Sequence, residues 1–436
     1  IAILSIAVPV QAQLPPGALT EPGDPAPVVA ATAHLPRLDD IDPVRFDYAQ
    51  AIDENYFIAT RTGTPLNSGN DLLPDDGRIW VDVIRPDTEE PVPIILIASP
   101  YYNTLGRGWR GEGKAPEAGG VDAPVPGVLT GFPFAVPYPE WYDEYFVPRG
   151  YAVALMDLRG TRNSTGCQVY GDRDEVLDVV DVIDHLVEQP WSNGKVGMTG
   201  GSYDGTVAIG AADEMVASGR HPEALAAIIP IRAIGRWYDY HFFNGVQSSG
   251  HAATPALFAG VLAAEDLQNT PLEDDLLLPL HIAQRKACIP TVGAATVAGY
   301  ASPYQDTSQP FWVERDFTQH LAQWQAAPFF IHGLFDFNVK THTTAYVWEQ
   351  LPANLPRMIW WADMDHADPH IPTVEDQGSH QMPFPYRPKF IDATHRWYLQ
   401  HLKNVEAGAL ALPVAQVQDF GGDWLLSDHW PVAETE

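Results

Sequence analysis

The feature that most constrains this chain is a glycine-rich turn between a short apolar strand and a helix. Lys195–Thr199 is predicted as a buried strand, GGSYDG follows it as the turn, and TVAIGAADEMV is compatible with a helix. A strand that turns directly into a helix leaves room only for small residues. The turn lifts the hydroxyl of Ser202 out of the sheet and aims the amide of Tyr203 at the same place. Ser202 is therefore predicted as a nucleophile, the alternative being a glycine-rich turn with an incidental serine.

The remainder of the chain from Arg78 onward alternates short apolar runs with helical periodicity. Further predicted strands are Ile79–Ile84, Pro93–Ala98, Tyr151–Met156, Ala226–Pro230, Pro328–His332 and Arg357–Trp361. They hold few alternating polar residues, as expected for strands buried on both faces of a mostly parallel sheet. The residues Glu175–Gln189 have the spacing of an amphipathic helix that Pro190 ends. This order of strand, helix and strand predicts an α/β fold.

A serine hydroxyl needs a base to become a nucleophile, and the base needs an acid that orients it. After a serine on such a turn, the acid and then a histidine are expected, each in a loop that follows a strand. Asp336 and His366 satisfy both the order and the placement. The competing histidines are His332, His342, His370 and His380. His332 lies inside a predicted strand and is expected to be packed, whereas His370 is the main rival of His366.

Charge excludes two classes of partner for this chain of 436 residues. It holds 25 basic and 56 acidic residues, so its net charge is 25 − 56 = −31. Nothing in such a chain would neutralise phosphates, so we expect no nucleic-acid partner and no anionic membrane surface. The cysteines and histidines show no ligand spacing, so no metal and no organic cofactor is expected. Whether the chain forms a homo-oligomer stays open.

The N-terminal segment and the two cysteines bear on the compartment. Residues 1–12 form an apolar run that ends in Val10-Gln11-Ala12, which resembles the remnant of a secretory signal. The alternative is a buried strand, but the Pro- and Ala-rich stretch that follows favours a linker over 13–45. A secreted or periplasmic protein is therefore expected. In that compartment Cys167 and Cys288 could form a disulfide, the alternative being two free thiols.

Several segments together resemble the Xaa-Pro dipeptidyl-peptidase and cocaine-esterase-like group of α/β-hydrolases. The first is PWSNGKVGMTGGSYDGT. The common motif G-x-S-x-G would place a glycine at 204, where this chain has Asp204. The group has G-x-S-Y-x-G at this turn, which accounts for the glycine at 205. The others, in order, are SPYYNT, DLRGTRNSTG, IIPIRAIGRWYDY, DTSQPFWVERD, HGLFDFNVK and DHADP. The resemblance extends from Asp47 to Pro431. The WYDY segment and HGLFDFNVK are more similar to the dipeptidyl-peptidase branch than to the esterase branches.

The resemblance implies a role for particular residues. Ser202 would be the nucleophile, Asp336 the orienting acid and His366 the base of an enzyme that releases Xaa-Pro dipeptides through an acyl-enzyme. The oxyanion would be held by the hydroxyl of Tyr101 and the amide of Tyr203. A proline pocket would be lined by Trp237, Tyr240 and Val339. The substrate ammonium would need a carboxylate from the cap, where the candidates are Glu265, Asp266, Glu273, Asp274 and Asp275.

The same resemblance implies an α/β-hydrolase fold with an inserted helical cap. The core would comprise residues 46–245 and 308–405, with the cap over 246–307. Residues 411–436 would be the truncated start of a C-terminal β-sandwich domain. The substrate would be a peptide or a small ester. The alternatives to a dipeptidyl-peptidase are an acyl-ester or α-amino-acid ester hydrolase on the same scaffold, and a catalytically dead hydrolase that serves as a binding module.

Overall fold

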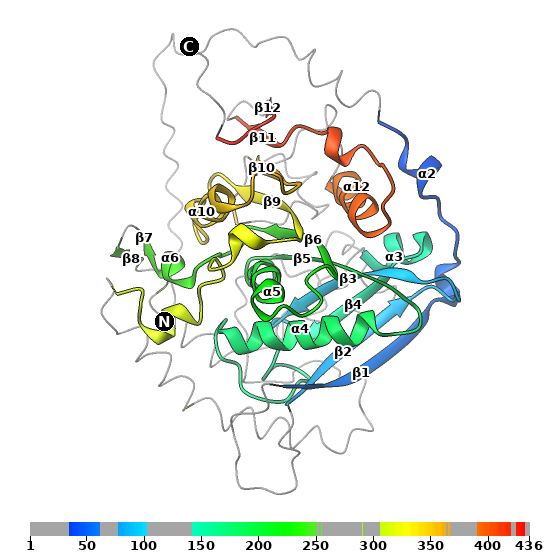
Figure 1. Ribbon diagram of the computed structural model, residues 1–436, viewed down its shortest axis with the longest axis horizontal. Helices are drawn as coiled ribbons and strands as arrows, with labels where there is room; N and C mark the ends of the chain where they lie inside the picture. Colours follow the sequence, from blue (N-terminus) through cyan, green and yellow to red (C-terminus); the bar gives the residue numbers. More distant parts are fainter. Residues whose placement is uncertain are drawn as a thin grey trace, which may run out of the picture.

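A single ten-stranded sheet forms the centre of the molecule (Figure 1). The computed structural model describes residues 35–61, 77–102, 142–243, 245–248, 251, 254, 290, 306–362, 365–366, 390–419 and 424–431. Along the sheet the strands are β1 (Ile52–Thr60), β2 (Gly77–Arg85), β4 (Ala152–Asp157), β3 (Val92–Ser99), β5 (Ser192–Gly201), β6 (Leu225–Ile231), β9 (Ala327–Gly333), β10 (Met358–Ala362), β11 (Ala415–Gln418) and β12 (Trp424–Ser427). From β4 to β11 all neighbours are parallel, whereas β1, β2 and β12 pair antiparallel. The predicted α/β fold is confirmed.

Helices cover both faces of the sheet. The longer ones are α4 (Arg173–Val187), α5 (Tyr203–Ser218), α10 (His342–Gln350) and α12 (Phe390–Leu402). Shorter helices are α2 (Leu38–Ile41), α3 (Tyr142–Phe146), α6 (Trp237–His241) and α9 (Pro310–Val313), and 3-10 turns span Tyr48–Gln50, Val147–Arg149, Leu321–Gln323 and Ala409–Ala411. A small hairpin of β7 (Phe242–Phe243) and β8 (Val246–Gln247) follows α6. The helix predicted over residues 175–189 corresponds to α4, whose N-terminus is capped by the side chain of Asp172.

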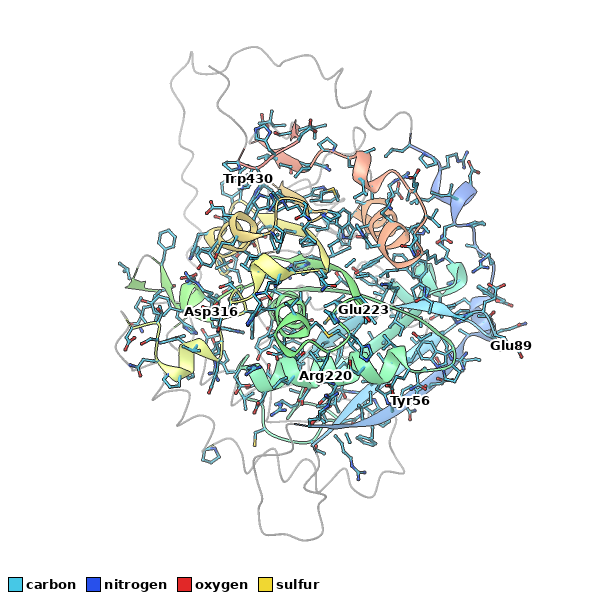
Figure 2. All side chains as sticks on the ribbon, in the orientation of Figure 1. Tyr56, Glu89, Arg220, Glu223, Asp316 and Trp430 are labelled. Carbon is cyan, nitrogen blue, oxygen red and sulfur yellow. The ribbon has the colours of Figure 1, made fainter. Side chains whose placement is uncertain are left out.

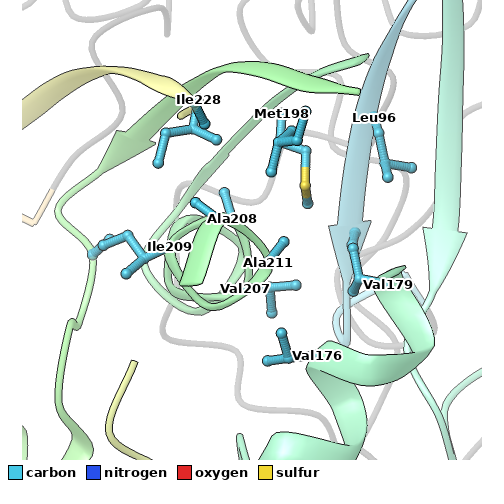
Figure 3. Close-up of a cluster of buried hydrophobic side chains, with 14 of the residues drawn as sticks. Leu96, Val176, Val179, Met198, Val207, Ala208, Ile209, Ala211 and Ile228 are labelled. Carbon is cyan, nitrogen blue, oxygen red and sulfur yellow. The ribbon is translucent and has the colours of Figure 1, made fainter. Parts of the chain in front are cut away.

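Alternating residues of the central strands separate the core into two layers. On one face, Leu96, Met198 and Ile228 pack against the apolar sides of α4 and α5 (Figure 3). On the other face, the next residues along the same strands, such as Ile97 and Ile229, pack with α3 and α12. Both faces are dry, which is why the strand sequences are almost continuously apolar. The parallel strands are therefore held rigidly, and their carboxyl ends lie along one edge of the sheet.

Two parts of the sheet differ from the sequence-based expectation. β1 was not predicted, because only one side of this edge strand is covered and its residues alternate in exposure. Residues 411–436 were expected to open a separate β-domain, and for the described part of them this is wrong. β11 pairs parallel with β10, and β12 pairs with β11, so both extend the main sheet. The unpaired edge of β10 offers backbone groups that a short strand satisfies. Trp430, labelled in Figure 2, follows β12, and its ring centroid lies 5.4 Å from that of Trp361 of β10.

Other parts of the predicted organisation lie outside the described residues. These are the signal-like segment 1–12, most of the linker 13–45 and nearly all of the helical cap 246–307. Within the part of the chain that the structure describes, no helix is both long and apolar enough to cross a bilayer.

Candidate active site

Four predicted site residues follow four strands of the parallel sheet. Tyr101 follows β3, Ser202 follows β5, Asp336 follows β9 and His366 follows β10. Because these strands run in the same direction, their carboxyl ends meet at one edge of the sheet. Residues that are up to 265 positions apart in the sequence are thereby brought to one place, as the arithmetic 366 − 101 indicates.

The turn between β5 and α5 forces Ser202 into an unusual backbone conformation. Its φ is 58° and its ψ is −118°, a combination that residues with a side chain rarely adopt. The turn is closed by glycines, since a Cβ on Gly205 would lie 2.6 Å from the carbonyl oxygen of Gly200. A Cβ on Gly200 would itself lie 2.4 Å from Cβ of Asp204. The predicted requirement for small residues around the serine is therefore confirmed.

Ser202, His366 and Asp336 form a continuous chain of hydrogen bonds. Nε2 of His366 lies 3.1 Å from Oγ of Ser202, and Nδ1 of the same ring lies 2.8 Å from Oδ2 of Asp336. The other carboxylate oxygen of Asp336 accepts from the backbone amides of Asn338 and Val339, both at 2.8 Å. Burial tends to raise the pKa of Asp336, but its hydrogen bond to His366 and the charge of that ring outweigh burial and leave the pKa lowered. Asp336 therefore stays an acceptor that fixes the orientation of the imidazole.

The competing histidines are placed elsewhere. His332 is fully buried in β9, where its ring contacts Oγ1 of Thr344 at 2.7 Å and the carbonyl oxygen of Val339 at 2.8 Å. His332 is therefore packed, as the sequence predicted, and burial lowers its pKa to about 4, which keeps the ring neutral. His342 begins α10. His370 and His380 lie outside the described residues.

The two residues expected to hold an oxyanion are neighbours. The ring of Tyr101 meets the ring of Tyr203 edge to face, with centroids 6.2 Å apart. Burial, and next the charge of Asp204, raise the pKa of Tyr101 well above its ordinary value, so its hydroxyl keeps its proton. The amide of Tyr203 is the first of α5, at the helix end where N–H groups and the positive end of the dipole favour negative charge.

A buried polar network that the sequence did not reveal lies beneath this end of α5. The hydroxyl of Tyr203 donates to Oε2 of Glu175 at 2.7 Å and accepts from Nε2 of Gln168 at 3.0 Å. Glu175 is completely buried, and burial together with the nearby charge of Asp172 raises its pKa to about 7. In the sequence Glu175 is one of two acidic residues in the first turn of α4, the other being Asp174. Only the contact between α4 and α5 distinguishes it.

The three residues expected to line a proline pocket are all buried. Trp237 packs edge to face on Tyr203 and on Tyr240, with ring centroids 5.1 and 5.7 Å apart. The hydroxyl of Tyr240 donates to Oδ1 of Asn338 at 2.9 Å, and Val339 is the next residue, fully buried. The aromatic pair is therefore connected directly to the turn that carries Asp336. Whether these residues bind substrate stays a prediction.

The remaining candidates are only partly described. Cys167 is disulfide-bonded, and the sequence holds only one other cysteine, Cys288, which lies outside the described residues. The cap carboxylates Glu265, Asp266, Glu273, Asp274 and Asp275 also lie outside them. Over the part of the chain that the structure describes, no three His, Cys, Asp or Glu residues are grouped so that they could hold a metal ion.

Comparison with known proteins establishes the family. The family model "X-Pro dipeptidyl-peptidase (S15 family)" matches residues 75–368. A Streptomyces avermitilis protein named "Putative Xaa-Pro dipeptidyl-peptidase" is 30% identical over 414 residues, which cover 90% of this chain and 52% of that protein. The chain belongs to peptidase family S15. The resemblance seen in the sequence is confirmed.

Further comparisons show how much of its relatives' length this chain spans and which solved structures share its fold. The Xaa-Pro dipeptidyl-peptidase of Pediococcus pentosaceus is 28% identical over 407 residues, 86% of this chain and 44% of that protein. This member of family S15 thus spans about half the length of the curated relatives it matches. A solved CocE/NonD family hydrolase from Staphylococcus aureus superposes with a TM-score of 0.59 at 17% identity, over 88% of this chain and 57% of that one. The fold is that of the α/β-hydrolases.

Proposed function

We propose that this chain is a serine hydrolase that releases Xaa-Pro dipeptides from the N-termini of peptides. The observation that carries the proposal is the hydrogen-bonded chain from Ser202 through His366 to Asp336. A serine, an imidazole and a carboxylate in this order form the arrangement that activates a hydroxyl for acyl transfer. Membership of family S15 and the dipeptidyl-peptidase names of the relatives support the choice of substrate.

In the proposed reaction, Oγ of Ser202 attacks the carbonyl carbon of the proline residue. Nε2 of His366 takes the hydroxyl proton while Asp336 stabilises the imidazolium. The resulting oxyanion accepts hydrogen bonds from the hydroxyl of Tyr101 and the amide of Tyr203. His366 then gives the proton to the leaving amine, which departs and leaves an acyl-enzyme. Water, activated by the same histidine, hydrolyses this ester and restores the serine.

In the proposed substrate complex, Trp237 and Tyr240 face the proline ring. A pyrrolidine ring is flat and apolar, so aromatic faces bind it without leaving polar groups unpaired. Val339 would complete this apolar surface. The second candidate is an acyl-ester or α-amino-acid ester hydrolase. It is favoured by the superposition with an α-amino acid ester hydrolase, at a TM-score of 0.52 and 18% identity.

A substrate panel separates the two candidates. We expect hydrolysis of Ala-Pro and Gly-Pro anilides at rates well above those of simple acyl esters. We also expect a fluorophosphonate probe to label the wild type but not Ser202→Ala. Ester hydrolysis without prolyl cleavage would select the second candidate. A folded wild type that resists the probe would rule out a serine enzyme and favour the binding module.

We further propose that the chain works outside the cytoplasm. The apolar segment Ile1–Ala12 and the disulfide at Cys167 support this location, because disulfides persist in oxidising compartments. Fractionation of expressing cells combined with thiol counting is the test. Recovery in the cytosolic fraction with two free thiols would contradict the proposal.

A further inference from the structure

An exposed phenylalanine lies directly beside the candidate catalytic residues. Phe337 follows Asp336 in the chain and is 69% exposed. Its ring centroid lies 6.3 Å from that of His366. Leu334 and Phe335, in the same connection between β9 and α10, are 40% and 43% exposed. Three exposed apolar residues therefore flank, in the sequence, the aspartate that orients the histidine.

The backbone that carries Phe337 is fixed rather than loose. Oδ1 of Asp336 accepts from the amides of Asn338 and Val339, which closes a tight turn around Phe337. The ammonium of Lys340 donates to the carbonyl oxygen of Phe337 and so holds the turn from the other side. An aromatic side chain on a fixed backbone presents apolar surface with little conformational entropy left to lose on binding.

The turn presents its residues to two different sides of the site. Asn338 accepts from Tyr240, and Val339 is buried with the aromatic residues that the proposed reaction assigns to the acyl group. Phe337 instead faces the imidazole of His366. In acyl transfer the histidine gives its proton to the leaving group, so the leaving group lies beside the imidazole. Phe337 is therefore on the side of the leaving group.

We propose that Phe337 forms a subsite for an apolar side chain on the first residue of the released peptide. The proposal rests on the proposed serine hydrolase function and adds a preference that the triad alone does not supply. Contact between the ring of Phe337 and an apolar side chain excludes water from both. The gain is realised before the acyl-enzyme forms, so it affects the acylation step and not its hydrolysis.

The test compares Ala-Pro-Phe-amide with Ala-Pro-Gly-amide. Both peptides give the same acyl-enzyme, so the ratio of their kcat/KM values reports on the leaving group alone. We expect wild type to favour the Phe peptide, Phe337→Ala to reduce this ratio about tenfold, and Phe337→Leu to keep most of it. Phe57→Ala is the matched control, because Phe57 is 38% exposed on β1 and contacts Trp80. A ratio that Phe337→Ala leaves within twofold of wild type would overturn the proposal.

Two further measurements keep the result interpretable. Fluorophosphonate labelling of Phe337→Ala at the wild-type rate shows that Ser202 and His366 are intact in the variant. If wild type hydrolyses esters but not these peptides, the proposed dipeptidyl-peptidase function fails, and the subsite is tested with benzyl and methyl esters of one acid. A lower benzyl-to-methyl ratio in Phe337→Ala would then support the subsite, and an unchanged ratio would reject it.

Discussion

At the scale of single residues, Asp336 has two tasks that use its two oxygens. Oδ2 bonds the imidazole of His366, while Oδ1 bonds two backbone amides of its own turn. The carboxylate thus fixes the ring and the loop that carries Phe337 and Val339. A substitution at this residue affects the tautomer of the histidine first, because an amide nitrogen placed at Oδ2 would donate where the ring also donates.

Asp336→Asn is expected to lower kcat by about 10⁴-fold while the protein stays folded. The asparagine is isosteric and keeps an acceptor for the turn, but it stabilises the wrong tautomer of His366. Steady-state kinetics on an Ala-Pro anilide measures the effect, and circular dichroism checks the fold. Asp40→Asn, at an exposed residue of α2, serves as the control. A variant with more than a tenth of the wild-type kcat would remove Asp336 from the mechanism.

The sequence was sufficient to predict the three residues that form the hydrogen-bonded chain, but not the residues that pack around them. Ser202, Asp336 and His366 could be predicted because each follows an apolar strand and their order is restricted. Glu175 could not, since its partner Tyr203 is 28 residues away and lies on another helix. Phe337 was equally hidden, because its proposed role depends on which way a turn of three residues faces.

At the scale of elements, α4 and α5 are coupled through one buried carboxyl group. Glu175 on α4 bonds the hydroxyl of Tyr203, and Tyr203 is the first residue of α5. The pKa of Glu175 is raised to about 7, mainly by burial and then by the charge of Asp172. In the unfolded chain its pKa would be near 4.5. The folded protein therefore binds a proton here that the unfolded chain has released between those two pH values.

This coupling predicts a pH dependence of stability. The contribution of Glu175 is fully present below pH 4.5 and is lost as the pH rises through about 7, by up to about 3 kcal/mol. Glu175→Gln resembles the protonated carboxyl, so this variant should gain stability relative to wild type as the pH rises from 5 to 8. Urea unfolding midpoints at several pH values give the measurement.

Glu223→Gln is the control for the Glu175 experiment. Glu223 is 65% exposed and is labelled in Figure 2, so its substitution should not change the pH dependence. Parallel wild-type and Glu175→Gln curves would show that this carboxyl does not titrate between the two states.

Some strands and strand pairings could be predicted from the sequence, and others could not. The central strands could be predicted because both of their faces are buried and their composition is nearly uniform. β1 alternates in exposure, and its partner β2 could not be inferred from that pattern. β11 has the composition of any short strand, so nothing in it indicates that it pairs with β10 and not with a separate sheet.

At the scale of the whole molecule, the net charge of the chain affects how charged substrates approach it. The net charge is −31, which creates a negative potential well beyond the surface at low ionic strength. The proposed substrates have a free N-terminal ammonium. The field of the protein would therefore attract them before any contact forms.

Salt should weaken this attraction. We expect kcat/KM for Ala-Pro anilide to fall several-fold between about 0.01 and 0.5 M NaCl, because the Debye length shrinks from about 30 Å to less than 8 Å. The same peptide with an acetylated N-terminus, or a neutral ester if that is the substrate hydrolysed, is the uncharged control and should change little. If kcat/KM depends on salt equally for charged and neutral substrates, the negative charge does not attract the substrate and serves only solubility.

The backbone conformation of Ser202 affects which substitutions at this position would be favoured during evolution. A residue with a side chain at φ 58° and ψ −118° costs the folded state about 1–3 kcal/mol, and glycine would remove most of that cost. Ser202→Gly is thus a change that folding alone would favour. In a population that had lost the need for the reaction, stability and mutation would both act against the serine. Under the proposed function, the protein holds the serine hydroxyl in position at a cost in stability.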